Sequence, residues 1–407
     1  MNRLVLIGNG FDLAHGLKTS YKDFFYWYWS QRFNNIHKVR TKTAEDILCS
    51  MTTLGYDSWY YLMFYNHVQL SSYDGRQLYE MLNNENLFAI NYNSLLDNIR
   101  KSIETKGWVD IENEYYDLLK NYVLKHVSIP HIESLNEQLQ FLQSKLVEYL
   151  NSIEISDKLL KSEIRQKIYA PINLTDISIE SEQALIDHLS SGMNQDENCW
   201  NNKLRQYASN CYSYGYVSDY KKKFSDKVVL NDELPDELLL PNQIMLLSFN
   251  YTHTPYLYCK DGSIFSVNQI HGDLNNPKSV IFGYGDELDE NYKTLVDKNE
   301  NIFLGNIKSI KYLEADNYRK MLSFIESEPY QILIMGHSCG NSDRTLLNTL
   351  FEHKNCVSIK PYYYQKDNDH DNYIELIQNI SRNFKDMKLM RDRVVNKTYC
   401  EPLTRNN

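Results

Sequence analysis

The chain opens with the stretch that decides its fold, Arg3-Leu4-Val5-Leu6-Ile7, which runs directly into Gly8-Asn9-Gly10-Phe11-Asp12. The first part is a continuous apolar run, and such a run predicts a central strand of a parallel sheet that is covered on both faces. A glycine turn after that strand lets the backbone approach a ligand, because the N–H groups of a following helix can hold a phosphate. A plain strand-to-helix turn is the alternative interpretation.

The turn departs from the dinucleotide-binding fingerprint of dehydrogenases. That fingerprint has a third glycine three residues after the second one, where this chain has Leu13. It also has an acidic residue at the end of a second strand about 20 positions later, and no clear counterpart follows here. The turn therefore does not predict an ordinary dehydrogenase.

The overall composition excludes several classes of protein. With 43 Lys and Arg against 53 Asp and Glu, the 407-residue chain has a formal net charge of −10, so we do not expect the cationic surface that nucleic acids require. Apolar runs such as 332–335 are far shorter than the roughly 18 residues of a membrane-spanning helix, and the N-terminus lacks the pattern of a signal peptide. The 7 cysteines show no zinc or C-x-x-C spacing. We therefore expect a cytoplasmic protein without a disulfide framework and without a metal site.

Residues 21–224 carry long helical patterns, in which apolar residues recur every three or four positions. The clearest lie at 94–105, 112–124 and 135–150. Proline is absent before Pro130, which also favours helices in this part of the chain.

Strand signals return after an acidic, proline-containing stretch at 231–241. Short apolar runs bounded by turn residues then occur at 244–249, 264–270, 280–282, 332–335 and 356–359. A helical pattern at 345–352 separates the last two. The chain therefore predicts an α/β fold with one mostly parallel sheet, built from residues 1–20 and 240–395, and a large helical insertion at 21–230.

Polar side chains follow three of the predicted strands. Asn250 comes after the strand at 244–249, His271 after the strand at 264–270, and Ser338 shortly after a third strand. A lone histidine at a strand end is more often structural than catalytic. However, the carboxyl ends of parallel strands meet at the edge where such sheets bind ligands, so three polar ends together predict a shared site.

The segment Gly336-His337-Ser338-Cys339-Gly340 matches the G-x-S-x-G turn that carries the nucleophile of many serine hydrolases. Such an enzyme needs an acid and then a histidine further along the chain. The downstream histidines are His353 and His370, and Asp369 is adjacent to the latter, which is too cramped for the usual separate loops. A serine hydrolase that uses Ser338 stays an alternative, beside a nucleotide-binding turn.

The segment Trp108-Val109-Asp110-Ile111-Glu112 leads into a predicted helix, with Asp110 as its N-cap. Together with Asp12, these carboxylates offer a further alternative, a metal-dependent nuclease, which the acidic net charge disfavours. Alone, such carboxylates are usually solvated cap residues.

Several different short motifs are distributed along nearly the whole chain. They are Leu6-Ile7-Gly8-Asn9-Gly10-Phe11-Asp12, Gly16-Leu17-Lys18-Thr19-Ser20-Tyr21, Asp23-Phe24, Trp108-Val109-Asp110-Ile111-Glu112, Phe249-Asn250-Tyr251-Thr252, His271-Gly272-Asp273, Gly283-Tyr284-Gly285-Asp286, Gly336-His337-Ser338 and Ser342-Asp343. In this order, the chain resembles the AbiH-type bacteriophage abortive-infection family. The resemblance implies a role in phage defence.

More distantly, the same segments are similar to sirtuin-like domains of NAD-cleaving phage-defence enzymes, which implies a Rossmann-like sheet. On that template Asn250 and His271 stand at the catalytic positions, and Thr252 stands where the template usually has an aspartate. The residues that the resemblance places around the dinucleotide are Gly8, Asn9, Gly10, Phe11, Asp12, Ser338 and Asp343. NAD is then a substrate, and no other cofactor is implied.

The resemblance and the residue types together predict an effector that hydrolyses NAD or a related nucleotide at its N-glycosidic bond. Cleavage places positive charge on the sugar. Asn250 can orient sugar hydroxyls and water because an amide both donates and accepts, and His271 can take the proton of the water. A nucleotide-sensing module without turnover is the alternative, because Thr252 replaces an acid. We also expect a phage-derived trigger, self-association and no membrane contact.

Overall fold

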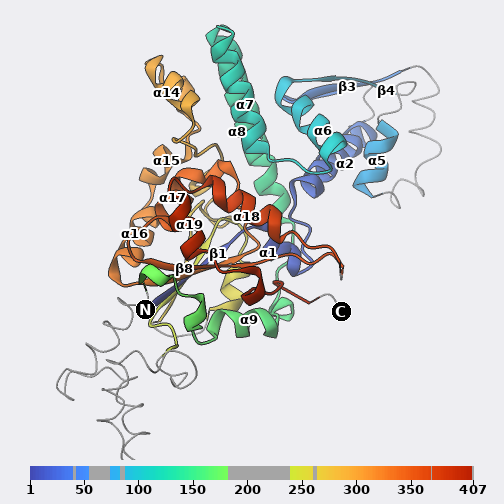
Figure 1. The fold of residues 1–407 in the computed structure, drawn as a ribbon. Coiled ribbons are helices and arrows are strands. Elements are labelled where there is room, and N and C mark those ends of the chain that lie inside the picture. The colour runs from blue at the N-terminus through green and yellow to red at the C-terminus, as the bar shows by residue number, and fades with distance from the viewer. Residues whose placement is uncertain are drawn as a thin grey trace, which may run out of the picture.

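Five parallel strands form the central sheet of the computed structural model (Figure 1). They are β1 (Asn2–Ile7), β5 (Ile244–Ser248), β6 (Phe265–Gln269), β7 (Tyr330–Met335) and β8 (Cys356–Tyr362). Their order in space is β6-β5-β1-β7-β8, so the first strand of the chain lies at the centre, between β5 and β7. The predicted α/β fold with a mostly parallel sheet is therefore confirmed. The structure describes residues 1–39, 43–54, 74–82, 88–181, 239–259, 264–367 and 369–405.

Both faces of the sheet are buried, because successive side chains of a strand point to opposite faces. Leu4 and Leu6 face a core that includes α16 (Asn317–Ser327), α17 (Arg344–Phe351), α18 (Tyr373–Arg382) and α19 (Met387–Arg393). Val5 and Ile7 face the other core, which includes α1 (Asn9–Ala14) and α9 (Ser162–Tyr169). The continuous apolar run at the N-terminus is explained by this double burial.

Between β1 and β5 the described chain is mainly helical. Its helices, besides α1 and α9, are α2 (Tyr21–Val39), α5 (Gly75–Leu82), α6 (Ser94–Lys106), α7 (Ile111–Leu124) and α8 (Ile129–Asn151). The helices predicted at 94–105, 112–124 and 135–150 are thus confirmed. Figure 1 shows α7 and α8 projecting away from the central sheet, and the two helices contact each other.

A second, antiparallel sheet in this segment was not predicted. It consists of β2 (Thr43–Glu45), β3 (Cys49–Thr53) and β4 (Phe88–Tyr92), in the order β2-β3-β4. Its strands are only three to five residues long, and although the burial of β3 alternates, only Cys49 and Met51 among its buried residues are apolar. The buried side chains of β3 join the aromatic core formed with α2 and α5.

The strand predicted at 280–282 does not exist. These residues are buried, as their apolar character requires, but their backbone has other partners. Ile281 N donates to the carbonyl oxygen of His271 at 2.8 Å, and the carbonyl oxygen of Val280 accepts from Gln143 Nε2 at 2.7 Å. The segment therefore connects α8 with the loop after β6 instead of extending the sheet. The remaining short helices of this region are α14 (Glu290–Asp297) and α15 (Lys308–Lys311).

Part of the range 21–230 belongs to the core of the central sheet. Ile164 and Ile168 of α9 are fully buried in the same cluster as Val5 of β1. The predicted boundary at 231–241 lies outside the described residues up to position 238. The division of the chain into a sheet domain and a helical insertion stays a prediction.

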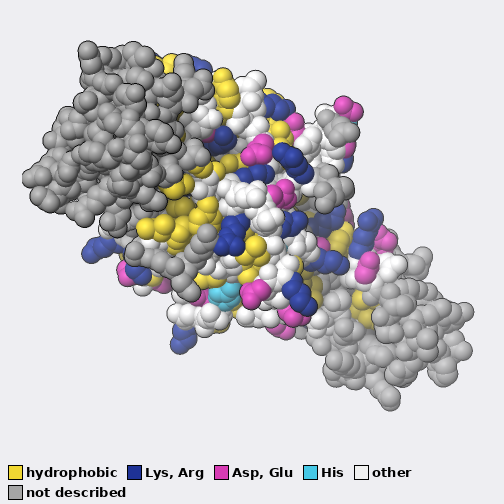
Figure 2. Space-filling view, turned by 90° about the horizontal axis from the view of Figure 1, so that it is seen from below, with side chains coloured by type: hydrophobic (Ala, Val, Ile, Leu, Met, Phe, Trp, Pro, Cys, Tyr) yellow, Lys and Arg dark blue, Asp and Glu magenta, His cyan; other side chains and the backbone are white. Residues whose placement is uncertain are grey.

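The surface shows no segregation of charge on the face drawn in Figure 2. Basic and acidic side chains of the described residues are interspersed there, with hydrophobic side chains between them. Such a face does not generate a large field of one sign. Within the described ranges, no helix combines the length and the apolar character that crossing a membrane would require.

Two turns pack backbone against backbone at the carboxyl ends of β1 and β7. Gly10 N donates to the carbonyl oxygen of Gly336 at 2.8 Å, and a Cβ on Gly10 would lie 2.8 Å from that oxygen. Gly336 has φ +75°, and a Cβ there would lie 2.0 Å from Phe11 N. Both positions therefore need glycine for close packing of the two turns.

We expect Gly336→Ala to lower the free energy of unfolding by more than about 3 kcal/mol, because left-handed strain and a backbone clash add together. Gly16→Ala is the matched control, since Gly16 has φ +79° and open space around its missing Cβ. The control should cost about 1 kcal/mol. Urea unfolding of both variants measures the difference, and equal losses would contradict the clash.

Candidate functional site

A cavity of about 1140 Å³ lies at the carboxyl edge of the central sheet. It is bordered by the turns after β1, β5, β6 and β7. The strand order reverses at β1, because β5 and β6 lie on one side of it and β7 and β8 on the other. Open α/β sheets bind ligands at such a reversal. Its lining includes Gly8, Asn9, Gly10, Asp12, Asn250, His271, Ser338 and Asp343. These strand ends therefore line one cavity, whereas its being a functional site and the chemical roles of its residues stay predictions.

Phe11, which was also expected at the ligand, lies elsewhere. Its ring is fully buried in the core under the sheet, 4.8 Å from the ring of His15 and 5.4 Å from that of Tyr258. Phe11 and Asp12 are consecutive residues of α1, and consecutive side chains of a helix point about 100° apart. One side chain therefore enters the core while the next one lines the cavity.

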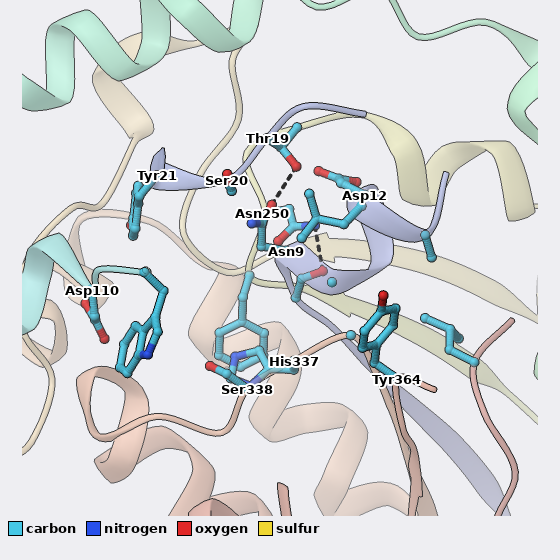
Figure 3. A pocket seen from close by; sticks show the side chains of 18 of the residues that line it. Asn9, Asp12, Thr19, Ser20, Tyr21, Asp110, Asn250, His337, Ser338 and Tyr364 are labelled. Carbon is cyan, nitrogen blue, oxygen red and sulfur yellow. Dashed lines mark hydrogen bonds between the residues drawn. The ribbon is translucent and has the colours of Figure 1, made fainter. Parts of the chain in front are cut away.

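Asp12 and Asn250 lie together beside the glycine turn (Figure 3). Thr252 Oγ1 donates to Asp12 Oδ2 at 2.7 Å, and Asn250 Nδ2 donates to the carbonyl oxygen of Gly8 at 3.0 Å. No described residue donates to Asn250 Oδ1. Thr252, which replaces the expected aspartate, thus contacts a carboxylate supplied by α1.

The carboxyl group of Asp12 is buried, and one of its oxygens forms no hydrogen bond with a described residue. The side chain is only 1% exposed, and Oδ1 has no hydrogen-bond partner among the described residues. Burial raises the pKa of Asp12 to about 6, although Thr252, which donates to Oδ2, and the nearby polar side chains of Thr254 and Asn250 oppose the shift. An unmade hydrogen bond of a buried group costs about 1–3 kcal/mol, so a donor on a ligand would bind favourably here.

Both ring nitrogens of His271 are engaged. Nδ1 lies 3.2 Å from the carbonyl oxygen of Phe249, to which it must donate, and Nε2 lies 3.1 Å from the hydroxyl of Tyr312. Asp343 Oδ1 is 3.2 Å from the same Nε2. Burial and the nearby charge of Lys308 lower the pKa of His271, which keeps the ring neutral at pH 7. This environment suits a positioning residue better than a general base that must reach a ligand.

A buried lysine joins the helical part of the chain to the sheet. Lys308 Nζ lies 2.9 Å from Glu112 Oε2, on α7, and 2.8 Å from Asp343 Oδ1, in the turn before α17. The side chain of Lys308 is fully buried. Glu112 Oε1 also accepts a hydrogen bond from Gly283 N at 3.0 Å.

The two carboxyl groups share this one cation unequally. Burial opposes the charge of Asp343, but Lys308 and His271 hold the pKa of Asp343 well below its usual range. Burial raises the pKa of Glu112 to about 8, and the attraction of Lys308 only partly opposes this shift. The opposite directions of the two shifts make Asp343 the stronger partner of Lys308, while both oxygens of Glu112 accept hydrogen bonds, from Lys308 Nζ and from Gly283 N.

The predicted cap of α7 is confirmed, because the side chain of Asp110 accepts from Asn113 N at 3.1 Å. The expectation that Asp110 and Glu112 are solvated is wrong for Glu112, which is 6% exposed and paired with Lys308. Glu112 lies in the cavity lining because α7 packs against the turn before α17. No group of residues in the described ranges has the arrangement of a metal site.

Ser338 lies at the cavity, but not in a catalytic triad. The preceding His337 uses Nδ1 to accept from Cys339 N at 3.0 Å. His353 pairs with Glu326 at 3.1 Å, and His370 with Asp367 at 2.7 Å; neither histidine lines the cavity. Among the residues that the structure describes, no histidine is hydrogen-bonded to Ser338 Oγ, so the geometry gives the serine hydrolase no support.

Lys308 was missed by sequence reasoning. It stands in no motif, and a lysine is expected at the surface unless a partner is visible nearby in the sequence. Its two partners are 196 and 35 positions away. The only available signal was the motif Trp108-Val109-Asp110-Ile111-Glu112, whose carboxylates had no assigned partner.

The fold and the cavity define an α/β protein with a polar ligand pocket at the carboxyl edge of a parallel sheet. The chain belongs to a family described as bacteriophage abortive infection AbiH, whose model matches residues 4–365. That range includes all five strands of the central sheet except the first residues of β1. The membership supports a role in abortive infection by phage. Comparisons with curated proteins and with solved structures give no match.

We expect Lys308→Met to lower the free energy of unfolding by about 3–5 kcal/mol at pH 8, because two buried carboxyl groups lose their cation. Without the lysine their folded-state pKa values rise, so the folded state binds more protons than the unfolded state and the loss shrinks as the pH falls. Urea unfolding at pH 8 and pH 5.5 measures this difference.

Lys320→Met is the control, because Lys320 forms an exposed pair with Asp316. This substitution should lower the free energy of unfolding by less than about 1 kcal/mol at both pH values. A loss for Lys308→Met that is the same at both pH values would contradict the shared ion pair.

Proposed function

We propose that the cavity binds NAD or a related nucleotide and hydrolyses its N-glycosidic bond, which would deplete the nucleotide during phage infection. The observation that carries this proposal is the buried carboxyl group of Asp12, whose Oδ1 has no partner among the described residues and which lines the cavity. Such a group requires a donor from a ligand, and a water molecule or a sugar hydroxyl supplies one.

The topology supports a nucleotide as the ligand. Numbered within the sheet, the strand order is 3-2-1-4-5, which matches the first five strands of the Rossmann order 3-2-1-4-5-6. We therefore include a Rossmann-like, sirtuin-like ancestry in the proposal. The glycine turn and the start of α1 lie at the reversal of strand order, where α/β proteins hold phosphates.

In the proposed reaction the bond between the ribose C1′ and the nicotinamide nitrogen breaks, and its electron pair leaves with nicotinamide. The oxygen of water forms the new bond to C1′, and the proton of the water passes to Asp12. Positive charge develops on the sugar before attack, and carboxylates around the cavity favour that charge. The products are nicotinamide, ADP-ribose and one proton.

Asn250 and His271 have different roles in this scheme. Asn250 is fixed through Nδ2 on Gly8, so its Oδ1 can accept from a ribose hydroxyl or from the attacking water. His271 was expected to be the base, but Nδ1 is engaged with the carbonyl oxygen of Phe249 and Nε2 with the hydroxyl of Tyr312, which favours a positioning role that holds the turn after β5 against Tyr312. We therefore assign the base to Asp12.

We expect Asp12→Asn and Asn250→Ala to lower nicotinamide release from NAD at least 100-fold, within the range for loss of a general base or an orienting group. His271→Gln should lower the rate of nicotinamide release less than Asp12→Asn does. Incubation of the full-length protein with NAD, followed by mass spectrometry, measures the products. Asp316→Asn, at an exposed position, is the control. Undiminished NAD consumption by Asp12→Asn would refute the assignment.

The rate of hydrolysis should depend on pH through Asp12. Because a base must be deprotonated and burial raises the pKa of Asp12 to about 6, kcat/KM should fall about tenfold per unit below that pH. Above it, kcat/KM should be constant. Initial rates between pH 4.5 and 8 measure the profile, and a flat profile across pH 5 to 7 would count against Asp12 as the base.

A nucleotide sensor without turnover is the second candidate. The observation that favours it is Thr252 at the position where an acid was expected. Calorimetry that detects binding of NAD, combined with no product by mass spectrometry, would select this candidate.

A further inference from the structure

An exposed tryptophan lines the same cavity and has no part in the scheme above. Trp108 is 59% exposed and lies in the short loop between α6 and α7. The loop begins at Gly107, whose φ of +77° ends α6, and it closes at Asp110, the cap of α7. Exposure of so large an apolar side chain is unfavourable in water, so a ligand that covers it would gain binding free energy.

The surroundings of the Trp108 loop are acidic. Asp110 accepts from Asn113 N, and its carboxyl group lies near the turn that carries Ser342 and Asp343. Asp110, Glu112, Asp343 and Asp12 all line the cavity, and the buried Lys308 pairs with two of them. Burial raises the pKa of Asp110 as well, so a cation beside it would stabilise its charged form.

Three cationic residues of the described chain line the cavity: Lys22 belongs to α2, and the other two lie at α9. Lys161 is the N-cap of α9, and Arg405 N donates to Glu163 of the same helix at 3.4 Å. A ligand with a cationic part and an anionic part would therefore orient in one direction, with its cationic part at α7 and its anionic part at α9. This polarity matches a molecule that combines a cationic ring with phosphates.

We propose that Trp108 stacks on a planar cationic ring of the ligand, which in NAD is the oxidised nicotinamide ring, with Asp110 on the same loop supplying negative charge. This inference rests on the proposed function for the identity of the ring. Tryptophan is the strongest cation–π partner among side chains. Lys106 Nζ already lies 5.9 Å from the centre of this ring, so the ligand takes the face that Lys106 leaves uncovered.

A second observation, which also carries the proposed function, favours a hydrogen-bond donor in this cavity. Asp12 Oδ1 is buried and unpartnered within the described part of the chain. If a ribose hydroxyl or the attacking water fills that site, the ring attached to the ribose lies within the same cavity. The helical part of the chain would then select the base, while the sheet performs the chemistry.

The test is calorimetry with two small probes on the full-length protein: 1-methylnicotinamide, a cation, and nicotinamide, its neutral counterpart. We expect the cation to bind the wild type at least tenfold more tightly than nicotinamide. Trp108→Ala should lower the affinity for the cation at least tenfold. Trp108→Phe, which keeps a ring, should lower this affinity about threefold or less. Tyr399→Ala is the control, because Tyr399 is 51% exposed and lies outside the lining.

The inference is overturned if the cation shows no measurable binding, if both probes bind equally, or if Trp108→Ala leaves the affinity unchanged. Its failure can be told from that of the proposed function. Trp108-dependent binding of the cation without nicotinamide release from NAD refutes hydrolysis and leaves the subsite standing. If the protein hydrolyses NAD but Trp108→Ala binds the cation as tightly as the wild type does, only the subsite is refuted.

Discussion

The contact between two backbone turns, after β1 and after β7, is the constraint on which the site depends. Gly10 donates to the carbonyl oxygen of Gly336, and neither position has room for a Cβ. This contact fixes the start of α1, which directs Asp12 into the cavity and Phe11 into the core. The glycines of the first motif therefore serve the packing of the protein itself, and any phosphate would bind to a turn that is already held.

Charge is the second organising feature. Four carboxyl groups line the cavity near α7 and α1, and one buried lysine stabilises two of them. The remaining carboxyl groups, Asp12 and Asp110, have pKa values raised by burial. Such a region disfavours further anions and favours a cation or a transition state with positive charge. The same electrostatics thus support both the hydrolysis that we propose and the cationic subsite at Trp108.

The sequence predicted the parts of the fold whose signal is local. The apolar run at 3–7, the strand ends at Asn250 and His271, and the long helical patterns all follow from periodicity and turn residues. The prediction at 280–282 was wrong because an apolar run shows burial but not hydrogen-bond partners. Lys308 was missed because its role arises only when distant segments meet.

In our proposal the general base moves from His271, one of the predicted catalytic pair, to Asp12, which the sequence had placed around the dinucleotide. Residue type alone favoured His271, whose ordinary pKa is near neutrality. Burial reverses this order, because it lowers the pKa of His271 and raises that of Asp12 toward 6. The sequence places His271 at a strand end and Asp12 just after the glycine turn, but it does not show how deeply each is buried.

The central claim is that Asp12 faces the ribose of a bound nucleotide. A crystal structure of the Asp12→Asn variant grown with NAD tests it most directly. The account predicts an intact nucleotide in the cavity, with its scissile ribose within hydrogen-bond distance of residues 12 and 250. Nucleotide bound elsewhere on the molecule, or an empty cavity at a saturating NAD concentration, would contradict it.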